Sequence, residues 1–319
     1  MFMIGVTLGD PSGIGPEITA KSLPELIKRN IKLTLFGNRD NFVEMLNLLN
    51  INNDILDKLD FINIQSDEKI EYGKINKNSG SIAIKSIEKA VEYALNNKID
   101  AIATAPINKE AIIMAGSKYI DHTSMLKELT KSKFTTTIFE VNDLRITFLS
   151  KHLSLYNAIK YVTKENVFNA IVLADKSLKL LGIKNGRIAV AALNPHGGEN
   201  GLFGSEEINE IKPAIDSLKN KINVYGPIPA DSVFYYASQG KYDIVLSLYH
   251  DQGHIAAKTY DFNNTVSMNI GLPFLRTSVD HGTAFDIAGR GITENKSMLE
   301  AMLKADKYGN QYRKNYINL

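Results

Sequence analysis

Cysteine is absent from this sequence. A chain without cysteine cannot form a disulfide, a thiolate zinc site or a cysteine nucleophile, so three kinds of site are excluded together. The sequence also lacks any apolar run approaching the ~20 residues that a membrane helix needs. Its first residues, Met1–Val6, are too short and uncharged for a signal peptide, and Gly9-Asp10-Pro11 interrupts them. We therefore expect a cytoplasmic protein with no membrane partner.

The sequence also lacks a strong excess of positive or negative charge. The formal net charge is +2 and the basic residues form no long run, which argues against nucleic acid as a partner. The 44% hydrophobic and 23% charged content is that of an ordinary globular protein. At roughly 100–200 residues per domain, 319 residues leave room for two domains with a sizeable core.

Short apolar runs alternate with helical patterns, which predicts an α/β fold with a mainly parallel sheet. The expected strands are Met3–Leu8, Lys32–Phe36, Asp100–Ala103, Leu144–Leu149, Arg187–Leu193, Asp243–Leu248 and Val266–Ile270. The expected helices are Ser79–Leu95, Glu165–Leu181, Glu206–Leu218 and a closing helix that includes Ser297–Leu303. The helical period turns Leu95 and Val172 inward. No linker marks a boundary, so two domains would share a continuous sheet or be crossed by the chain more than once.

Three of the six histidines directly follow predicted strands: His152, His196 and His250. Ligands of parallel sheets bind at the carboxyl ends of the strands, so these side chains can converge on one point. Neutral imidazole is the commonest metal ligand, and three protein ligands with an open position form a catalytic site. One such histidine alone would more often cap a loop, but the shared context of three favours one divalent metal ion. No HExxH-type spacing supports this interpretation, which depends on context.

Two polar turns join predicted strands to helices, Gly9–Glu17 and Thr104–Lys109. The first matches neither a Walker loop nor a GxGxxG fingerprint. Its glycines indicate either a tight turn with positive φ or an exposed backbone that lines a ligand cleft, with an anion at the helix N-terminus. Lys258 and Arg276 are cations near the histidine segments. Each forms a surface salt bridge or holds a phosphate or carboxylate.

Six blocks, in this order, resemble the 4-hydroxythreonine-4-phosphate dehydrogenase family of vitamin B6 synthesis. They span nearly the whole chain and are Gly9–Glu17, Thr104–Lys109, Leu193–His196, Gly226–Asp231, Tyr249–Gly253 and Arg276–Ala284. The resemblance implies oxidation and decarboxylation of 4-phosphooxy-L-threonine to 3-amino-2-oxopropyl phosphate, for pyridoxal phosphate synthesis. It implies NAD or NADP and one divalent ion, zinc, magnesium, manganese or cobalt. A sister group with the same metal pattern acts on D-threonate or D-erythronate 4-phosphate in sugar-acid catabolism.

The resemblance also implies site residues. It assigns His152, His196 and His250 to the metal, shared across the interface of a homodimer. It assigns the small phosphorylated hydroxy acid to His122, Thr123, Lys258, Ser267 and Arg276. Three positions depart from the family pattern: Ser267 replaces asparagine, Ser124 replaces glutamate and Lys151 replaces threonine. These positions lie beside the substrate, so the choice between the two substrate groups stays open. His254 receives no functional role and is interpreted as structural.

A more distant resemblance concerns the segment His281–Gly291. It is similar to the nucleotide loop of isocitrate and isopropylmalate dehydrogenases, and it implies their two-domain α/β fold. That loop binds the adenosine half of NAD, which explains the missing Rossmann fingerprint. The implied cofactor contacts are His281, Gly282, Thr283, Ala284 and Asp286. The alternative is a glycine-rich connection, and Asp286 and Arg290 favour opposite choices between NAD and NADP.

The implied division puts residues 1–115 and 265–319 on the cofactor side and 116–264 on the metal and dimerisation side. The metal would act as a Lewis acid on the substrate hydroxyl as hydride leaves, and again during loss of carbon dioxide. Lys109 and Asp251 are candidate proton acceptors by residue type alone. The rivals are an acyltransferase of the same architecture and a non-catalytic binder of phosphate esters. The three strand-end histidines argue against both.

Overall fold

The computed structural model describes residues 2–66 and 68–318, which divide into two compact units. Unit 1 comprises Met1–Thr135 and Val266–Leu319, and unit 2 is Thr136–Thr265. The chain therefore passes into unit 2 and back, as the lack of a linker allowed. The sequence placed the first boundary after residue 115. The contacts place it after Thr135, because the helix at His122–Leu129 packs into the core of unit 1.

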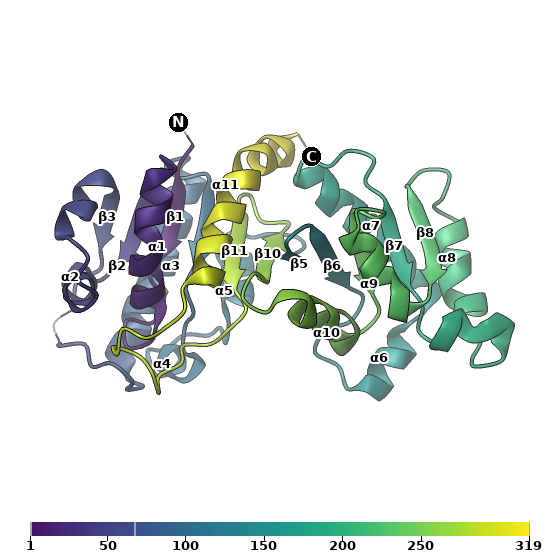
Figure 1. The fold of residues 1–319 in the computed structure, drawn as a ribbon, viewed down its shortest axis with the longest axis horizontal. Coiled ribbons are helices and arrows are strands. Elements are labelled where there is room, and N and C mark those ends of the chain that lie inside the picture. Colours follow the sequence, from purple (N-terminus) through teal and green to yellow (C-terminus); the bar gives the residue numbers. More distant parts are fainter. Residues whose placement is uncertain (1, 67, 319) are drawn as a thin grey trace. The chain divides into compact units, whose positions relative to one another are not determined.

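Unit 1 is a sheet with helices on its faces; α1 and α11 lie side by side in front of it in Figure 1. The strand order is β3-β2-β1-β4-β11-β10, and every pairing is parallel except that of β10 with β11. The strands are β1 (Ile4–Thr7), β2 (Leu33–Gly37), β3 (Asp60–Asn63), β4 (Ala101–Thr104), β10 (Val266–Ile270) and β11 (Leu275–Val279). The helices are α1 (Gly15–Lys28), α2 (Arg39–Leu48), η1 (Asn53–Lys58), α3 (Lys77–Leu95), α4 (Lys109–Met114), α5 (His122–Leu129) and α11 (Lys296–Ile317).

Unit 2 has the strand order β5-β6-β9-β7-β8. Strands β5 and β6 form an antiparallel hairpin, and the other pairings are parallel. The strands are β5 (Thr136–Val141), β6 (Leu144–Phe148), β7 (Ile188–Ala191), β8 (Val224–Ile228) and β9 (Ile244–Ser247). The helices are α6 (Leu155–Tyr161), α7 (Lys164–Leu180), η2 (Pro195–Gly201), η3 (Glu207–Ile211), α8 (Lys212–Asp216), α9 (Ala230–Ser238) and α10 (His250–Asp261). The predicted α/β class with mainly parallel strands is confirmed.

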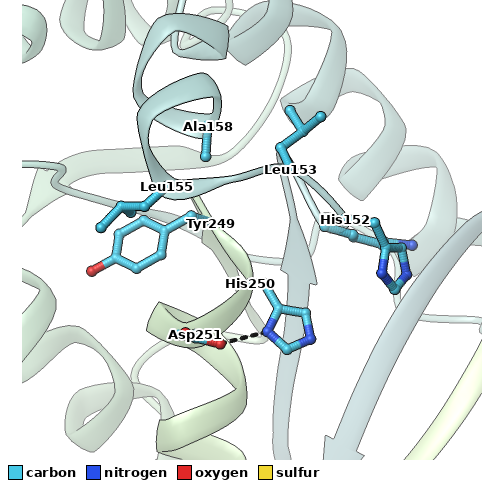
Figure 2. A pocket seen from close by; sticks show the side chains of 8 residues that line it. His152, Leu153, Leu155, Ala158, Tyr249, His250 and Asp251 are labelled. Carbon is cyan, nitrogen blue, oxygen red and sulfur yellow. Dashed lines mark hydrogen bonds and ion pairs between the residues drawn. The ribbon is translucent and has the colours of Figure 1, made fainter.

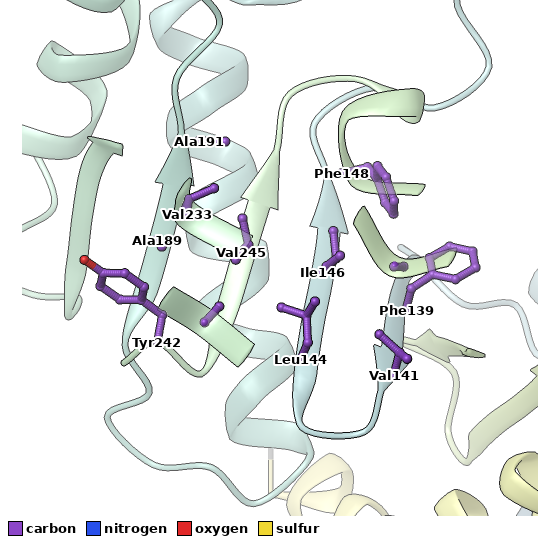
Figure 3. Packing of buried hydrophobic residues seen from close by; sticks show 12 residues of the cluster. Phe139, Val141, Leu144, Ile146, Phe148, Ala189, Ala191, Val233, Tyr242 and Val245 are labelled. Atoms are coloured by element: carbon purple, nitrogen blue, oxygen red, sulfur yellow. The ribbon is translucent and has the colours of Figure 1, made fainter. Parts of the chain in front are cut away.

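Each unit has its own apolar core. In unit 1, Met125 and Leu126 of α5 pack with Phe36 and Phe274 of the sheet region. Removing the Leu126 side chain beyond Cβ would cost about 2–5 kcal/mol. In unit 2, buried side chains of β5, β6, β7 and β9 form one cluster (Figure 3). These cores hold the strand ends that carry the polar residues.

Side-chain caps fix where the helices that follow those strand ends begin. Asn108 accepts a hydrogen bond from the amide of Ala111 at the start of α4. Asp121 accepts one from the amide of Ser124 at the start of α5. Each cap contributes about 1 kcal/mol and fixes the first helical residue. Lys109 and His122 are therefore placed by their caps.

Two predicted helices differ from the structure in extent. The closing helix runs over Lys296–Ile317, much further than the predicted part. Gly309 weakens the helical pattern of this segment in the sequence. A Cβ at Gly309 would lie 2.8 Å from the Cβ of Ala101, so glycine permits the close packing of the helix on β4. The predicted Glu206–Leu218 helix begins with a π-helical turn, η3, and continues as the α-helix α8. Pro213 has no N–H to donate to the carbonyl four residues earlier, which disfavours a regular start.

Two predicted inward positions are wrong. Leu95 is 47% exposed and Val172 is 39% exposed. Leu95 is the last residue of α3, and the buried residues of this helix end at Ala94. In α7 the buried stripe passes through Val167, Ile171 and Leu178, and Val172 lies beside it. Within residues 2–66 and 68–318, no helix is long and apolar enough to cross a bilayer.

Candidate active site

The three strand-end histidines leave the same edge of the unit 2 sheet. Strands β6, β9 and β7 are parallel neighbours, and His152, His250 and His196 follow their carboxyl ends in that order. The order along the edge comes from the strand pairing, which the sequence did not specify. The placement at strand ends agrees with the sequence analysis. The role of these histidines as metal ligands stays a prediction.

His152 and His250 line one cavity of about 280 Å³ in unit 2 (Figure 2). Their ring centroids are 6.2 Å apart. The lining is completed by Lys151, Leu153, Leu155, Ala158, Tyr249 and Asp251. Because zinc binds imidazole nitrogen at about 2.0–2.1 Å, two rings at this separation can be neighbouring ligands of one ion. Burial lowers the pKa of Lys151 to about 8, so this side chain is still largely protonated at neutral pH.

His250 is held from two sides. Its Nδ1 lies 2.6 Å from Asp251 Oδ1, the contact that the dashed line in Figure 2 marks. One helical turn later His254 stacks on the His250 ring at a centroid distance of 4.1 Å. His254 itself packs on Phe148 at 4.9 Å and on Phe139 at 4.4 Å. This packing is compatible with a structural role for His254, which stays a prediction. A carboxylate at Nδ1 leaves Nε2 of His250 for a metal.

His196 lies in η2 with a left-handed backbone (φ 54°) and an exposed side chain. The start of its loop is held by the buried carboxylate of Glu207. That carboxylate accepts hydrogen bonds from the amides of Leu193 and Asn194 at 2.8 and 2.7 Å, and from Asn194 Nδ2 at 2.8 Å. Bonds to a charged acceptor are the stronger kind, so Glu207 fixes where the loop leaves β7. The sequence analysis missed Glu207, which has the pattern of an ordinary helical residue.

In the described part of the chain, no three His, Asp or Glu side chains are placed to hold a metal ion. One copy of the chain thus brings His152 and His250 together without bringing His196 to them. Convergence of all three histidines within one chain is not found. Two imidazoles suit a divalent ion such as zinc, and a third ligand has to come from elsewhere. The predicted sharing of the metal between two copies is compatible with this arrangement and stays a prediction.

Unit 1 buries a guanidinium whose nitrogens reach Thr104, the last residue of β4. Arg276 of β11 donates from Nε and Nη2 to Thr104 Oγ1 at 3.0 and 2.6 Å, and from Nη1 to Asn269 Oδ1 at 2.6 Å. Burial lowers the pKa of Arg276 to about 9 while Asp121 opposes the shift, so the group is charged at neutral pH. These bonds use three of its five N–H groups and leave one on each terminal nitrogen. Arg276 is 5% exposed, so a surface salt bridge is excluded.

His122 adds an unpaired ring nitrogen to this region. Its ring is buried, and its Nε2 has no hydrogen-bond partner among the described residues. Burial lowers the pKa of His122 well below its usual value, and the charge of Arg276 lowers it further, so the imidazole is neutral. His122 and Thr123 are the first residues of α5. A helix N-terminus, a buried guanidinium and an unpaired imidazole nitrogen form an environment for an anion.

Ser267 lies on the sheet face that carries Arg276. The β10–β11 register pairs Asn269 with Arg276 and Ser267 with Ser278. Paired residues, and residues two apart on one strand, point to the same face. The structure thus brings Ser267 and Arg276, two predicted substrate residues of unit 1, to one face. The sequence analysis missed Asn269, because its role depends on the register of an antiparallel pair.

The positions of the other predicted site residues, Lys258, Lys109 and Asp251, do not by themselves indicate a role. Lys258 lies on α10, with its Nζ 5.3 Å from the centroid of the Phe262 ring. Lys109 is exposed at the first position of α4. Asp251 is exposed and bound to His250. The choice between Lys109 and Asp251 as proton acceptor therefore stays a prediction.

The turn at Gly9–Glu17 is buried, so the first of the two alternatives, a tight turn, is found in place of an exposed backbone. Gly9 has φ 71°, which fits the tight-turn alternative. The sequence analysis missed Asp10 within this turn. Asp10 Oδ1 accepts from the amide of Ser12 at 2.9 Å, and Oδ2 has no partner in the described residues. Burial raises the pKa of the Asp10 carboxyl to about 6.

The predicted nucleotide loop covers that turn. The carbonyl of Thr283 accepts from the amide of Ile14 at 3.0 Å, and a Cβ at Gly13 would lie 2.9 Å from that of Thr283. Beyond the loop, buried Glu17 accepts from the amide and hydroxyl of Thr293 at 2.8 and 2.6 Å. These contacts fasten the loop to α1 and the turn before it.

Within this fastened loop the predicted cofactor residues differ in exposure. Gly282 and Asp286 are exposed, His281 and Ala284 are half-buried, and Thr283 is buried. The Nδ1 of His281 lies 3.0 Å from the carbonyl of Gly282. Ala284 has an unusual left-handed φ of 41°. Binding of a nucleotide by this loop stays a prediction.

Residues 17–305 match the model of a family described as pyridoxal phosphate biosynthetic protein PdxA. The chain belongs to the PdxA family. A Halalkalibacterium halodurans protein, provisionally named D-threonate 4-phosphate dehydrogenase, is 48% identical, with 96% of each chain covered. A Clostridium botulinum (strain Hall) protein with the same provisional name is 45% identical over 98% of each. The crystal structure of 4-hydroxythreonine-4-phosphate dehydrogenase from Klebsiella pneumoniae has a TM-score of 0.87 at 36% identity, covering 97% of this chain and 100% of that one.

Membership of the PdxA family confirms the resemblance found in the sequence. Both kinds of relative are named dehydrogenases, so the chain is an oxidoreductase. The acyltransferase and the non-catalytic phosphate-ester binder are excluded as alternatives. The names of the relatives differ only in the substrate, a hydroxy acid in one case and an amino acid in the other.

Proposed function

We propose that this PdxA-family dehydrogenase oxidises the C3 hydroxyl of D-threonate 4-phosphate and releases C1 as carbon dioxide. NAD or NADP would accept the hydride, and one divalent metal ion would be required. The observation that carries the proposal is the buried anion environment of Arg276 and His122. The substrate follows from the provisional names of the relatives at 48% and 45% identity. The second candidate is 4-phosphooxy-L-threonine, which the sequence resemblance placed first and which the name of the structure at 36% identity supports.

The 4-phosphate would bind in the region of His122 and Arg276. The two unused N–H groups of Arg276 suit phosphate oxygens, because guanidinium and phosphate form short, charge-assisted bonds. The neutral imidazole of His122 can donate from Nε2, and the amides of the first turn of α5 favour an anion. Thr123 would add its hydroxyl from the same turn. Ser267 and Lys258 would contact the C2 substituent and the carboxylate.

His152, His196 and His250 would hold the metal ion, with ligands drawn from two copies in a homodimer. When bound, the ion supplies Lewis-acid stabilisation of oxygen charge during both oxidation and decarboxylation. Asp251 and His254 hold the His250 ring, and the contact at Nδ1 leaves Nε2 available to bind the metal. Lys109 or Asp251 would accept the hydroxyl proton. Of these two, Asp251 is already bound to His250, and Lys109 is exposed to solvent.

The nicotinamide dinucleotide would bind at His281–Gly291. Glu17 and Thr293 fix one end of this segment, so the loop presents a preformed surface. His281, Gly282, Thr283, Ala284 and Asp286 would contact the adenosine half. An exposed Asp286 suits the free ribose hydroxyls of NAD, whereas an exposed Arg290 suits the extra phosphate of NADP.

The test is a nicotinamide reduction assay with D-threonate 4-phosphate, D-erythronate 4-phosphate and 4-phosphooxy-L-threonine, each with NAD and with NADP. We expect the highest kcat/KM with D-threonate 4-phosphate, release of one carbon dioxide per reduced nicotinamide, and loss of activity with a chelator. A preference for 4-phosphooxy-L-threonine would establish the second candidate. Activity unaffected by chelation, with no bound metal in the purified protein, would contradict the metal-dependent mechanism.

A further inference from the structure

The segments that carry His250 and His196 begin where the hydrogen bonds between their strands end. The last residue pair of the β7–β9 ladder is Val190 with Leu246, and both histidines lie beyond it. Residues on two separate segments need further contacts to keep a fixed spacing, since ligand positions are only as exact as the groups that support them. The contacts past the end of the ladder therefore bear on the geometry of the predicted metal site.

Gln252, in the first turn of α10, joins the two segments. Its Nε2 donates to the carbonyl of Ala192, which follows β7, at 2.9 Å. Its Oε1 accepts from the amide of Leu248, which follows β9, at 2.7 Å. Because one partner is a backbone carbonyl and the other a backbone amide, these bonds determine the orientation of the side-chain amide. A single side chain thus links the chain before His250 to the chain before His196.

Glu207 holds the same peptide group from its other end. The carbonyl of Ala192 and the amide of Leu193 belong to one planar unit. Gln252 donates to that carbonyl, and Glu207 accepts from that amide at 2.8 Å. Side chains of two helices, α10 and η3, therefore fix the plane of this peptide group. The direction in which the chain continues toward His196 depends on both.

We propose that Gln252 is a positioning residue of the metal site, which fixes the segments of His250 and His196 relative to each other. This inference rests on the proposed function, which assigns both histidines to a divalent ion. Gln252 would act through the backbone that carries the ligands. Ligand atoms have to lie within about 0.2 Å of their ideal distances, so a shift of either segment weakens binding. Because the link lies within one chain, it acts whether or not two copies share their sites.

A simpler role for Gln252 is to cap α10. A glutamine or glutamate at the third helical position commonly accepts a hydrogen bond from a backbone amide at the start of the helix. The bond from the Leu248 amide is of this kind, whereas the bond to Ala192 reaches another strand end. An ionised glutamate can keep the first bond but has no N–H for the second. Replacement by glutamate therefore separates capping from positioning.

The experiment compares wild type with Gln252→Glu, which keeps the acceptor, and with Gln252→Met, which removes both amide functions at similar size. Gln239→Glu, at the exposed end of α9, is the matched control for the added charge. Chelator-treated protein is titrated with cobalt(II), whose absorption spectrum reports both affinity and ligand geometry. Hydrogen exchange in the metal-free protein reports on the amides of Leu193 and Asn194. Thermal unfolding checks that each variant is folded, and Gln252→Leu replaces the methionine variant if that variant is not.

We expect both Gln252 variants to bind cobalt about tenfold more weakly than wild type and with a changed spectrum, the lower end of the effect of losing an outer-shell partner. In the metal-free protein the amides of Leu193 and Asn194 should exchange about fivefold faster, the factor to which one typical hydrogen bond corresponds. An added carboxylate attracts a cation, so weaker binding by Gln252→Glu cannot result from its charge. Gln239→Glu should match wild type in all three measurements.

Wild-type affinity and an unchanged spectrum in Gln252→Glu would overturn the inference, because capping of α10 would then be the role of this residue. The proposed function would stand in that case, since the ion is still bound. If wild type itself binds no divalent ion, the metal-dependent function is wrong and the inference fails with it.

Discussion

Arg276 donates two N–H groups to the single hydroxyl oxygen of Thr104, at 3.0 and 2.6 Å. The contact joins β11 to the neighbouring β4 and fixes the plane of a buried guanidinium. Because that plane is fixed by the protein, the remaining N–H groups are oriented before any ligand arrives. Such preorganisation lowers the entropy lost on binding.

Replacing Arg276 with methionine should weaken substrate binding strongly without destabilising the fold. Loss of two charge-assisted bonds to phosphate should raise KM by about 100-fold or more. Removing a buried, incompletely compensated charge should leave the free energy of unfolding unchanged or higher. Steady-state kinetics and urea unfolding measure the two effects, with Thr104→Ser as the control that keeps the hydroxyl. A loss of more than about 2 kcal/mol of stability would show that Arg276 is mainly structural.

The stability of the protein should depend on Asp10 between pH 4 and 6. Burial raises the pKa of its folded-state carboxyl to about 6 from the usual 3.8. In that window the folded state holds the proton more tightly than the unfolded state, so stability falls as pH rises, by up to roughly 3 kcal/mol. Above pH 6 the loss is complete. Asp10→Asn has no such proton, so its advantage over wild type should grow across this window.

Urea unfolding at half-unit steps from pH 4 to 7.5 measures this difference. Asp286→Asn, which changes an exposed carboxyl, is the matched control and should parallel wild type throughout. Parallel curves for wild type and Asp10→Asn would mean that the Asp10 carboxyl is not perturbed in the folded protein.

A bound anion should raise the pKa of His122. In the free protein, burial lowers this pKa and Arg276 lowers it further. An anion near the ring would stabilise the imidazolium, so sulfate, which does not titrate here, should shift the pKa upward. Histidine nitrogen resonances followed by NMR over pH 4.5–7.5 report the change. Arg276→Met should raise the pKa without sulfate, and sulfate should then have little further effect; no response to either change would contradict the proposed anion site.

Glu207 should control the loop that carries His196. Glu207→Ala leaves the buried amides of Leu193 and Asn194 without their acceptor, at a cost of about 1–3 kcal/mol. Disorder in this loop should also lower affinity for a divalent metal by about 10–100-fold, the usual effect of losing an outer-shell partner. Cobalt binding and thermal unfolding measure the two effects. Glu206→Ala removes one contact to Asn194 Nδ2 and serves as the milder control; equal effects of the two changes would argue against a special role for Glu207.

Mixed dimers can test the predicted sharing of the metal site. We expect His152→Ala, His196→Ala and His250→Ala each to be inactive alone. If one copy supplies two ligands and its partner the third, two of the three pairwise mixtures regain activity, because one intact site forms in each heterodimer. The pair that does not complement identifies the two ligands from one copy. Failure of all three mixtures, with subunit exchange verified by mass spectrometry, would show that the ligands are not divided between copies.

The alternation of strands and helices was predictable because it depends on local patterns of apolar residues. The strand-end positions of His152, His196 and His250 followed from the same patterns. The end of α11 did not, since Gly309 weakens the helical pattern and is explained only by its packing against Ala101. The boundary after Thr135 was missed because α5 belongs to unit 1 by packing, which no local pattern records.

Site residues within a recognisable sequence motif could be predicted. Residues whose roles depend on contacts between distant parts of the chain could not. Arg276 could be named from its block, but its bond to Thr104 joins residues 172 positions apart. Asn269, Glu207 and Asp10 acquire their roles from register, burial and loop geometry. The sequence also left open whether the Gly9–Glu17 turn is exposed, because its burial results from the cover provided by the loop at Thr283.

Strand β11 lies between β4 and β10 in unit 1, although unit 2 precedes it in the chain. During synthesis on the ribosome, one edge of β4 therefore lacks its hydrogen-bonding partner β11 until Thr136–Thr265 has been made. Unit 2 is one continuous segment and can complete its own core in that interval. An open strand edge readily pairs with another chain. The nascent protein is thus most exposed to aggregation between the emergence of β4 and that of β11.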